Sequence, residues 1–161
     1  LLNTATPTVI KGNYSEILAL YRDSYRSSGV DADSGLDIQT MDHAAIVLSR
    51  SLGTVILASG KVDIVTDGSR LYHIHNGTPL LSQVTGTGCL QGALCASYLS
   101  AKPSMEAVIT GSCVLGICGE LALTDRGTGT FLCSLMDQLS TLKDIEIEKY
   151  LNLEEISIEN I

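Results

Sequence analysis

Apolar residues recur at intervals of three and four along much of this chain, the spacing that places them on one side of an α-helix. Helices are predicted on this basis at residues 15–25, 38–52, 89–100, 105–124, 130–142 and, as a shorter element, 144–150. The helix at 38–52 has its apolar positions at Met41, Ala45, Ile46, Leu48 and Leu52. Gly53 is the expected end of that helix.

Short apolar runs bounded by turn residues predict β-strands between these helices. The strands are expected at residues 8–10, 54–58, 62–66, 71–75 and 156–158, and a polar loop at 27–37. The run at 54–58 is continuously apolar, as in a strand covered on both faces. Ser59-Gly60-Lys61 and Asp67-Gly68-Ser69 have hairpin-turn composition. A strand, two helices, a strand, a hairpin and a run of helices indicate one α/β domain over residues 1–161.

Composition supports a folded, apolar domain. Hydrophobic residues make up 45% of the 161 residues and charged residues 17%, and the mean hydropathy is +0.25, which argues against disorder. No uninterrupted apolar run reaches the roughly 18 residues that a membrane span needs. The richest stretch, 107–123, contains Gly111, Gly116 and Glu120, so we interpret it as a buried helix with close packing.

The net charge of −8 gives a nucleic-acid-binding role no electrostatic support. The five cysteines form no CxxC pair and no zinc-like spacing. Four of them, Cys95, Cys113, Cys118 and Cys133, are predicted to be small buried core residues of a protein in the reducing cytoplasm. Cys89 is the exception because of its position.

The sequence Val-Thr-Gly-Thr-Gly-Cys-Leu at 84–90 is a glycine-rich turn that runs into a predicted helix. The N–H groups of Gly86, Thr87, Gly88 and Cys89 can converge there on an anion, and a phosphate being transferred is the ligand that we favour. Cys89 would lie in the first helical turn, where the helix field favours the thiolate. The alternative for this loop alone is an ordinary strand-to-helix turn.

Four segments are similar in order and sequence to one known family. They are Ile-Lys-Gly-Asn-Tyr-Ser-Glu-Ile at 10–17, residues 54–63, His-Asn-Gly at 75–77 and residues 84–89. The chain resembles the C-terminal portion of the hydroxyethylthiazole kinases, a thiamine-salvage family of the ribokinase-like superfamily. The resemblance implies an α/β sandwich with a central, mostly parallel sheet and flanking helices. Because the chain begins with Leu1 and not methionine, we expect that it is a fragment or processed piece and that the fold's N-terminal part is missing.

The resemblance implies a cytoplasmic homotrimeric kinase that uses Mg²⁺ and ATP to phosphorylate the primary hydroxyl of hydroxyethylthiazole. Gly86 matches the loop glycine that lies against the substrate, and Cys89 matches the catalytic cysteine. Most ribokinase-like relatives have an aspartate base in place of Cys89. As a general base, Cys89 would take the proton from the attacking hydroxyl, while Gly86, Thr87 and Gly88 form the anion hole.

The same resemblance assigns residues for ATP and metal. Ser59 matches a threonine that contacts ATP, and Lys11 matches an arginine that contacts the phosphates. Lysine keeps the charge of arginine but not its bidentate fork. Asn13 and Glu16 match a segment that organises Mg²⁺ and its waters, with Glu16 as the metal residue and Asn13 acting indirectly. Taken alone, a glutamate at this position is more often a helix-capping residue.

Two other functions remain open at this level. One is a non-catalytic nucleotide-binding or oligomerisation module, for which the Lys11 and Ser59 departures would be early signs. The other is a ribokinase-like kinase for another small alcohol, such as a pyrimidine or a sugar, although Cys89 argues against it. His73 and His75 share a strand face, but we interpret them as strand residues because the sequence offers no third metal ligand at a suitable spacing.

Overall fold

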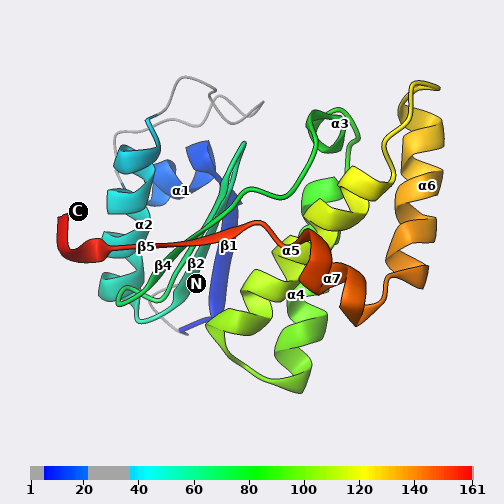
Figure 1. Ribbon diagram of the computed structural model, residues 1–161. Helices are drawn as coiled ribbons and strands as arrows, with labels where there is room; N and C mark the ends of the chain where they lie inside the picture. Colours follow the sequence, from blue (N-terminus) through cyan, green and yellow to red (C-terminus); the bar gives the residue numbers. More distant parts are fainter. Residues whose placement is uncertain (1–5, 22–36, 161) are drawn as a thin grey trace. The chain divides into compact units, whose positions relative to one another are not determined.

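The computed structural model describes residues 6–21 and 37–160, and the chain forms two compact units (Figure 1). Unit 1 runs to Ile74 and includes the stretch from Glu154 to the C-terminus, and unit 2 is His75–Leu153. Each unit has its own hydrophobic core. Within the described ranges, no helix combines the length and the apolar character needed to cross a membrane.

Unit 1 is built on a five-stranded sheet in the order β1-β2-β3-β4-β5. The strands are β1 (Val9–Asn13), β2 (Val55–Ser59), β3 (Asp63–Thr66), β4 (Leu71–Ile74) and β5 (Leu153–Ile156). β1 and β2 are parallel, whereas the β2–β3 and β3–β4 pairs are antiparallel. The α/β class is confirmed, but the expectation of a mostly parallel sheet is wrong for these described pairs. The connections at 60–62 and 67–70 are too short for the crossover that parallel neighbours need.

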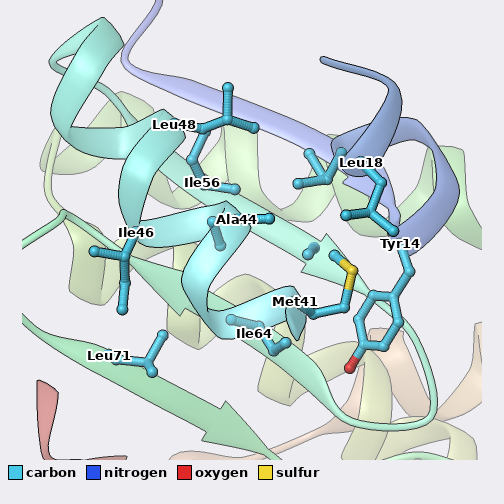
Figure 2. Close-up of a cluster of buried hydrophobic side chains, with 12 residues drawn as sticks. Tyr14, Leu18, Met41, Ala44, Ile46, Leu48, Ile56, Ile64 and Leu71 are labelled. Atoms are coloured by element: carbon cyan, nitrogen blue, oxygen red, sulfur yellow. The ribbon is translucent and has the colours of Figure 1, made fainter. Parts of the chain in front are cut away.

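Helices α1 (Tyr14–Tyr21) and α2 (Ile38–Leu52) pack on one face of this sheet. Figure 2 shows side chains of α2 facing side chains of the strands across this core. The buried members are Tyr14, Ile17, Leu18, Met41, Ala44, Ala45, Ile46, Leu48, Ile56, Ala58, Ile64 and Leu71. Gly53 ends α2 in the left-handed region, with φ 63°, and its N–H donates to the carbonyl of Ser49 at 2.9 Å. The predicted bounds of α2 are therefore confirmed at both ends.

Unit 2 is helical. Its helices are α3 (Pro79–Ser82), α4 (Thr87–Ala101), α5 (Met105–Leu121), α6 (Thr128–Thr141) and α7 (Asp144–Tyr150). Most residues of α5 are buried, and this helix packs against α4, α6 and α7, which confirms the sequence-based expectation of a buried helix. The buried core residues are Val84, Val114, Leu115, Cys118, Ala122, Phe131 and Leu135.

The close approach of α4 and α5 depends on Gly111. A Cβ atom at this position would lie 2.7 Å from the backbone nitrogen of Cys95 and 2.8 Å from its Cα. Beside this contact, Gln91 donates from Nε2 to Oγ of Ser112 at 2.9 Å, and both side chains are buried. The small residues of α5 thus allow backbone-to-backbone packing of the two helices.

Several predicted elements differ from the structure. The predicted helix and loop residues between 22 and 36 lie outside the described residues. The short helix α3 was not predicted, because four residues are too few to show a helical period; Thr78 caps it by accepting from the N–H of Leu80, and proline occupies its first position. The last strand lies at Leu153–Ile156 and is followed by a 3-10 turn at Ile158–Asn160. The strand begins earlier than predicted because the N–H of His75 already donates to the carbonyl of Asn152 at 2.9 Å.

The cysteine prediction holds for three residues and is wrong for one. Cys95, Cys113 and Cys118 are buried, but Cys133 is exposed together with Cys89. Cys133 lies on α6, whose buried residues are Phe131 and Leu135. Cys133 is two positions from each of them, which places it on the opposite side of the helix, away from the core. Burial, together with the Glu146 carboxylate, raises the pKa of the Cys118 thiol to about 11.

This distribution predicts how the thiols react. Cys89 and Cys133 should react rapidly with a disulfide reagent such as Ellman's reagent in the native protein, while Cys95, Cys113 and Cys118 should react only after unfolding, because they are buried. Counting fast and slow thiols by absorbance, with and without denaturant, checks this. A Cys133→Ser variant should lose one of the fast thiols of this chain, and an unchanged number would contradict the assignment.

Candidate functional site

The carboxyl ends of β1 and β2 bring three predicted site residues together in unit 1. Asn13 is the register partner of Ser59, and Lys11 is the partner of Leu57. Since side chains alternate along a strand, Lys11, Asn13 and Ser59 share one face of the sheet. Gly12 belongs to the other face, where a Cβ would meet Glu16 Cβ at 3.0 Å. Ligands of open α/β sheets bind beyond the carboxyl ends of parallel strands, so this position suits a nucleotide.

Asn13 and Glu16 form a reciprocal capping box at the start of α1. The N–H of Asn13 donates to Oε2 of Glu16 at 2.8 Å, and the N–H of Glu16 donates to Oδ1 of Asn13 at 2.9 Å. This is the helix-capping role that the sequence allowed for Glu16. The Glu16 side chain is exposed, so the cap leaves the carboxylate at the surface.

Ser59 ends β2 with its side chain half-buried. Its hydroxyl donates to the carbonyl of Gly12 on β1 at 3.3 Å. A serine hydroxyl also has two acceptor lone pairs, so Ser59 is tied to β1 and keeps the capacity to accept a hydrogen bond.

The turn that follows Ser59 contains contacts that the sequence analysis missed. Oδ1 of Asp63 accepts from the N–H of Gly60 at 3.0 Å. The Tyr14 hydroxyl donates to the carbonyl of Val62, and its ring lies so close to Gly60 that a Cβ there would be 2.6 Å from the ring. An aspartate three residues after the turn glycine is a capping signal that could have identified Asp63. Nothing local points to the contact of Tyr14, because Val62 is 48 residues away.

The glycine loop in unit 2 leads into α4 as expected, but the helix starts earlier. Gly86 is its N-cap with φ 99°, and the N–H of Leu90 donates to the carbonyl of Gly86 at 2.9 Å. The predicted start at residue 89 is therefore two residues late. Thr87, Gly88 and Cys89 form the first turn, the part of a helix whose N–H groups precede the first intrahelical bond.

The side chain of Thr87 does not take part in the predicted anion hole, because it is bonded within unit 2. Its hydroxyl donates to the carbonyls of Leu81 at 2.8 Å and Val84 at 3.1 Å. The side chain therefore ties the glycine loop to α3, and only the backbone N–H of Thr87 is placed in the first turn of α4. Any contribution of Thr87 to an anion hole would come from that N–H.

Cys89 is exposed in the first turn of α4. It belongs to unit 2 with Gly86, Thr87 and Gly88, whereas the predicted ATP and metal residues belong to unit 1. The structure thus brings the members of each group together within a unit. Chemically, unit 1 offers a cation, a hydroxyl and a carboxylate, and unit 2 offers backbone N–H groups beside a thiol.

The His-Asn-Gly segment has a structural role in unit 2. Nδ2 of Asn76 donates to the carbonyl of Tyr150 at 2.8 Å, and its Oδ1 accepts from the N–H of Asn152 at 2.8 Å. The N–H of Gly77 donates to Oε1 of Glu120 at 2.7 Å. These bonds join the segment to Glu120 on α5 and to residues 150–152 at the end of unit 2.

His73 is a buried residue of β4, as expected of a strand residue. A further potential metal ligand that sequence spacing did not suggest, the carboxylate of Glu154 on β5, lies within 4.8 Å of a ring nitrogen of His73. Nε2 of His73 lies 2.8 Å from Oδ1 of Asp42 on α2, and both side chains are buried. A buried histidine next to a carboxylate satisfies both polar groups within the core.

Comparison with known proteins gives a consistent result. A family model described as the hydroxyethylthiazole kinase family matches residues 1–145. Hydroxyethylthiazole kinase 2 of Clostridium botulinum is 37% identical over 153 residues, which cover 91% of this chain and 57% of that protein. The hydroxyethylthiazole kinase of Staphylococcus aureus is 36% identical over 161 residues, covering 97% of this chain and 59% of that protein.

A solved structure shows the same fold. The hydroxyethylthiazole kinase protein of Pyrococcus horikoshii superposes with a TM-score of 0.81 at 29% identity, over 92% of this chain and 55% of that chain. This likeness supports the α/β fold that the sequence predicted. The chain spans a little over half the length of the relatives that it matches.

Proposed function

This chain belongs to the hydroxyethylthiazole kinase family, and we propose that it supplies the catalytic loop and the ATP- and metal-binding residues of an ATP-dependent kinase. The reaction is transfer of the ATP γ-phosphate to the primary hydroxyl of hydroxyethylthiazole. The observation that carries this proposal is the helix N-terminus with Gly86 as its cap and Cys89 exposed in its first turn. In this proposal both units belong to one kinase domain.

ATP binds at the carboxyl ends of β1 and β2. Lys11 supplies the positive charge that an acidic chain needs locally to hold a triphosphate. The Ser59 hydroxyl, half-buried and bonded to the neighbouring strand, contacts the nucleotide from the same sheet face. This assignment is supported by the parallel register of Asn13 with Ser59.

Mg²⁺ fits the donor set of this region. Magnesium prefers oxygen ligands and keeps several waters while binding one or two carboxylates, and Glu16 presents an exposed carboxylate. Glu16 would hold the ion or its waters, and Asn13 would act indirectly by orienting Glu16 through the capping box. When bound, the ion neutralises charge on the phosphates.

The glycine loop and Cys89 carry the transfer step. The substrate hydroxyl oxygen forms a bond to the γ-phosphorus, the bond from that phosphorus to the ADP oxygen breaks, and Cys89 takes the hydroxyl proton. The N–H groups of the first turn of α4 and the helix dipole stabilise the negative charge of the transferred group. Gly86 lies against the substrate because it has no side chain.

The proposal also covers the oligomeric state of the kinase and its location in the cell. The kinase works as a cytoplasmic homotrimer, with its thiazole site shared between neighbouring subunits.

The test is ATP consumption by the full-length protein with hydroxyethylthiazole, with and without Mg²⁺, together with identification of the phosphorylated product. Metal-dependent formation of the phosphate ester is the expected result. Nucleotide binding without turnover on any small alcohol would instead indicate a non-catalytic nucleotide-binding module. Turnover on a pyrimidine or sugar alcohol, but not on the thiazole, would move the chain to another substrate.

A further inference from the structure

The 59–62 turn, which connects β2 to β3, is held by three contacts from different parts of unit 1. The Ser59 hydroxyl donates to Gly12 on β1, Asp63 accepts from the N–H of Gly60, and the Tyr14 hydroxyl donates to the carbonyl of Val62. Of these three contacts, the one from Tyr14 joins the far part of the turn to helix α1. The other two come from the strand residues Ser59 and Asp63 at the two ends of the turn.

Tyr14 is the residue directly after Asn13. Asn13 forms the capping box with Glu16, the proposed metal residue. Tyr14 contacts the turn that begins with Ser59, the proposed ATP residue. The Tyr14 side chain is 6% exposed and belongs to the core that α1 and α2 form with the sheet. A buried ring has few alternative rotamers, so the position of the hydroxyl is well defined.

The ring also determines which residue can occupy position 60. A Cβ on Gly60 would lie 2.6–3.0 Å from three ring carbons of Tyr14. The backbone of Gly60 therefore lies directly against the ring, at a distance that no other residue permits without displacement of the turn. The ring contact holds the turn at Gly60, and the hydroxyl bond holds it at Val62.

We propose that Tyr14 is a positioning residue for ATP: it holds the 59–62 turn against the start of α1 and thereby keeps the Ser59 hydroxyl in place to bind the nucleotide. This inference rests on the proposed function, because it assigns Tyr14 to the ATP site of that kinase. Tyr14 itself does not touch the reacting atoms.

The test compares Tyr14→Phe with Tyr21→Phe in the full-length enzyme, using steady-state kinetics and thermal unfolding. Tyr14→Phe keeps the ring and removes only the hydroxyl bond, which should raise KM for ATP about 2–10-fold, as expected for one lost hydrogen bond, and leave kcat at saturating ATP nearly unchanged. Tyr21 lies on the same helix and contacts His43 edge-to-face, so its variant should leave KM unchanged. A purely structural role would lower the melting temperature without moving KM.

A second pair of variants tests the ring contact. Gly60→Ala should also raise KM for ATP, because the added methyl group displaces the turn. In a Tyr14→Ala background the space beside position 60 is open, so the same Gly60→Ala change should raise KM little further, a non-additive result. If Tyr14→Phe and Gly60→Ala both keep the wild-type KM for ATP in an active kinase, the inference is wrong and the proposed function stands. A wild-type protein that neither binds nor consumes ATP overturns both.

Discussion

Replacing Cys89 by alanine should lower kcat of the full-length kinase by about 10²–10⁴-fold, the usual contribution of a general base. Alanine cannot accept the proton of the attacking hydroxyl, while the backbone of the first turn of α4 stays in place. The affinity for ATP should change little, because the substitution leaves the proposed ATP residues Lys11 and Ser59 and the backbone N–H groups of the first turn of α4 unchanged. Single-turnover kinetics and direct titration with ATP separate the two quantities.

Two further variants control this experiment. Cys133→Ala removes the other exposed thiol and should leave kcat unchanged, because Cys133 has no proposed role. Cys89→Asp should retain activity, since a carboxylate can take the same proton. Equal kcat in the wild type and Cys89→Ala would exclude the base role and leave the glycine loop as an anion-binding element only.

Replacing Gly111 by alanine should destabilise the protein by about 1–3 kcal/mol, the typical cost of overpacking a core. The new methyl group would lie 2.7–2.9 Å from the backbone and Sγ of Cys95. Backbone atoms of α4 cannot turn aside as a flexible side chain can, so the two helices must separate. Denaturant unfolding followed by circular dichroism measures the loss.

Gly92 offers the matched control on α4. A Cβ at Gly92 meets nothing within 4 Å, and glycine in a helix interior is less stable than alanine by about 0.5–1 kcal/mol. Gly92→Ala should therefore stabilise the protein while Gly111→Ala destabilises it. If both changes had the same sign, helix propensity and not the contact with Cys95 would govern position 111.

The sequence predicted those elements best whose signals are local. The bounds of α2 and α7 match the prediction, and Gly53 ends α2 with the left-handed backbone that its residue type favours. The start of α4 was placed late because Thr87 and Gly88 look like loop residues, although Gly86 already caps the helix. The mixed sheet follows from the two short hairpin connections, which were themselves predicted.

The candidate site was predictable in part. The segments around Lys11, Ser59 and Cys89 were identified from sequence, and the parallel register brings Asn13 opposite Ser59. What the sequence could not show are contacts between distant residues, such as the Tyr14 hydroxyl on Val62. The sequence could not show either that the Thr87 hydroxyl donates to the carbonyls of Leu81 and Val84, because the side-chain rotamer depends on which carbonyls lie nearby in the fold.

The hydrogen bonds of Asn76 have a consequence for the order in which the protein folds. Two of the partners of this one side chain, Tyr150 and Asn152, follow it by 74 and 76 residues. Contacts of such long sequence separation form late, because the entropy of closing the loop must be overcome first. During synthesis on the ribosome, Asn76 cannot form these two hydrogen bonds until residue 152 has left the exit tunnel. We therefore expect the helices of unit 2 to form before this clamp closes, because the clamp requires residue 152 to be free of the ribosome.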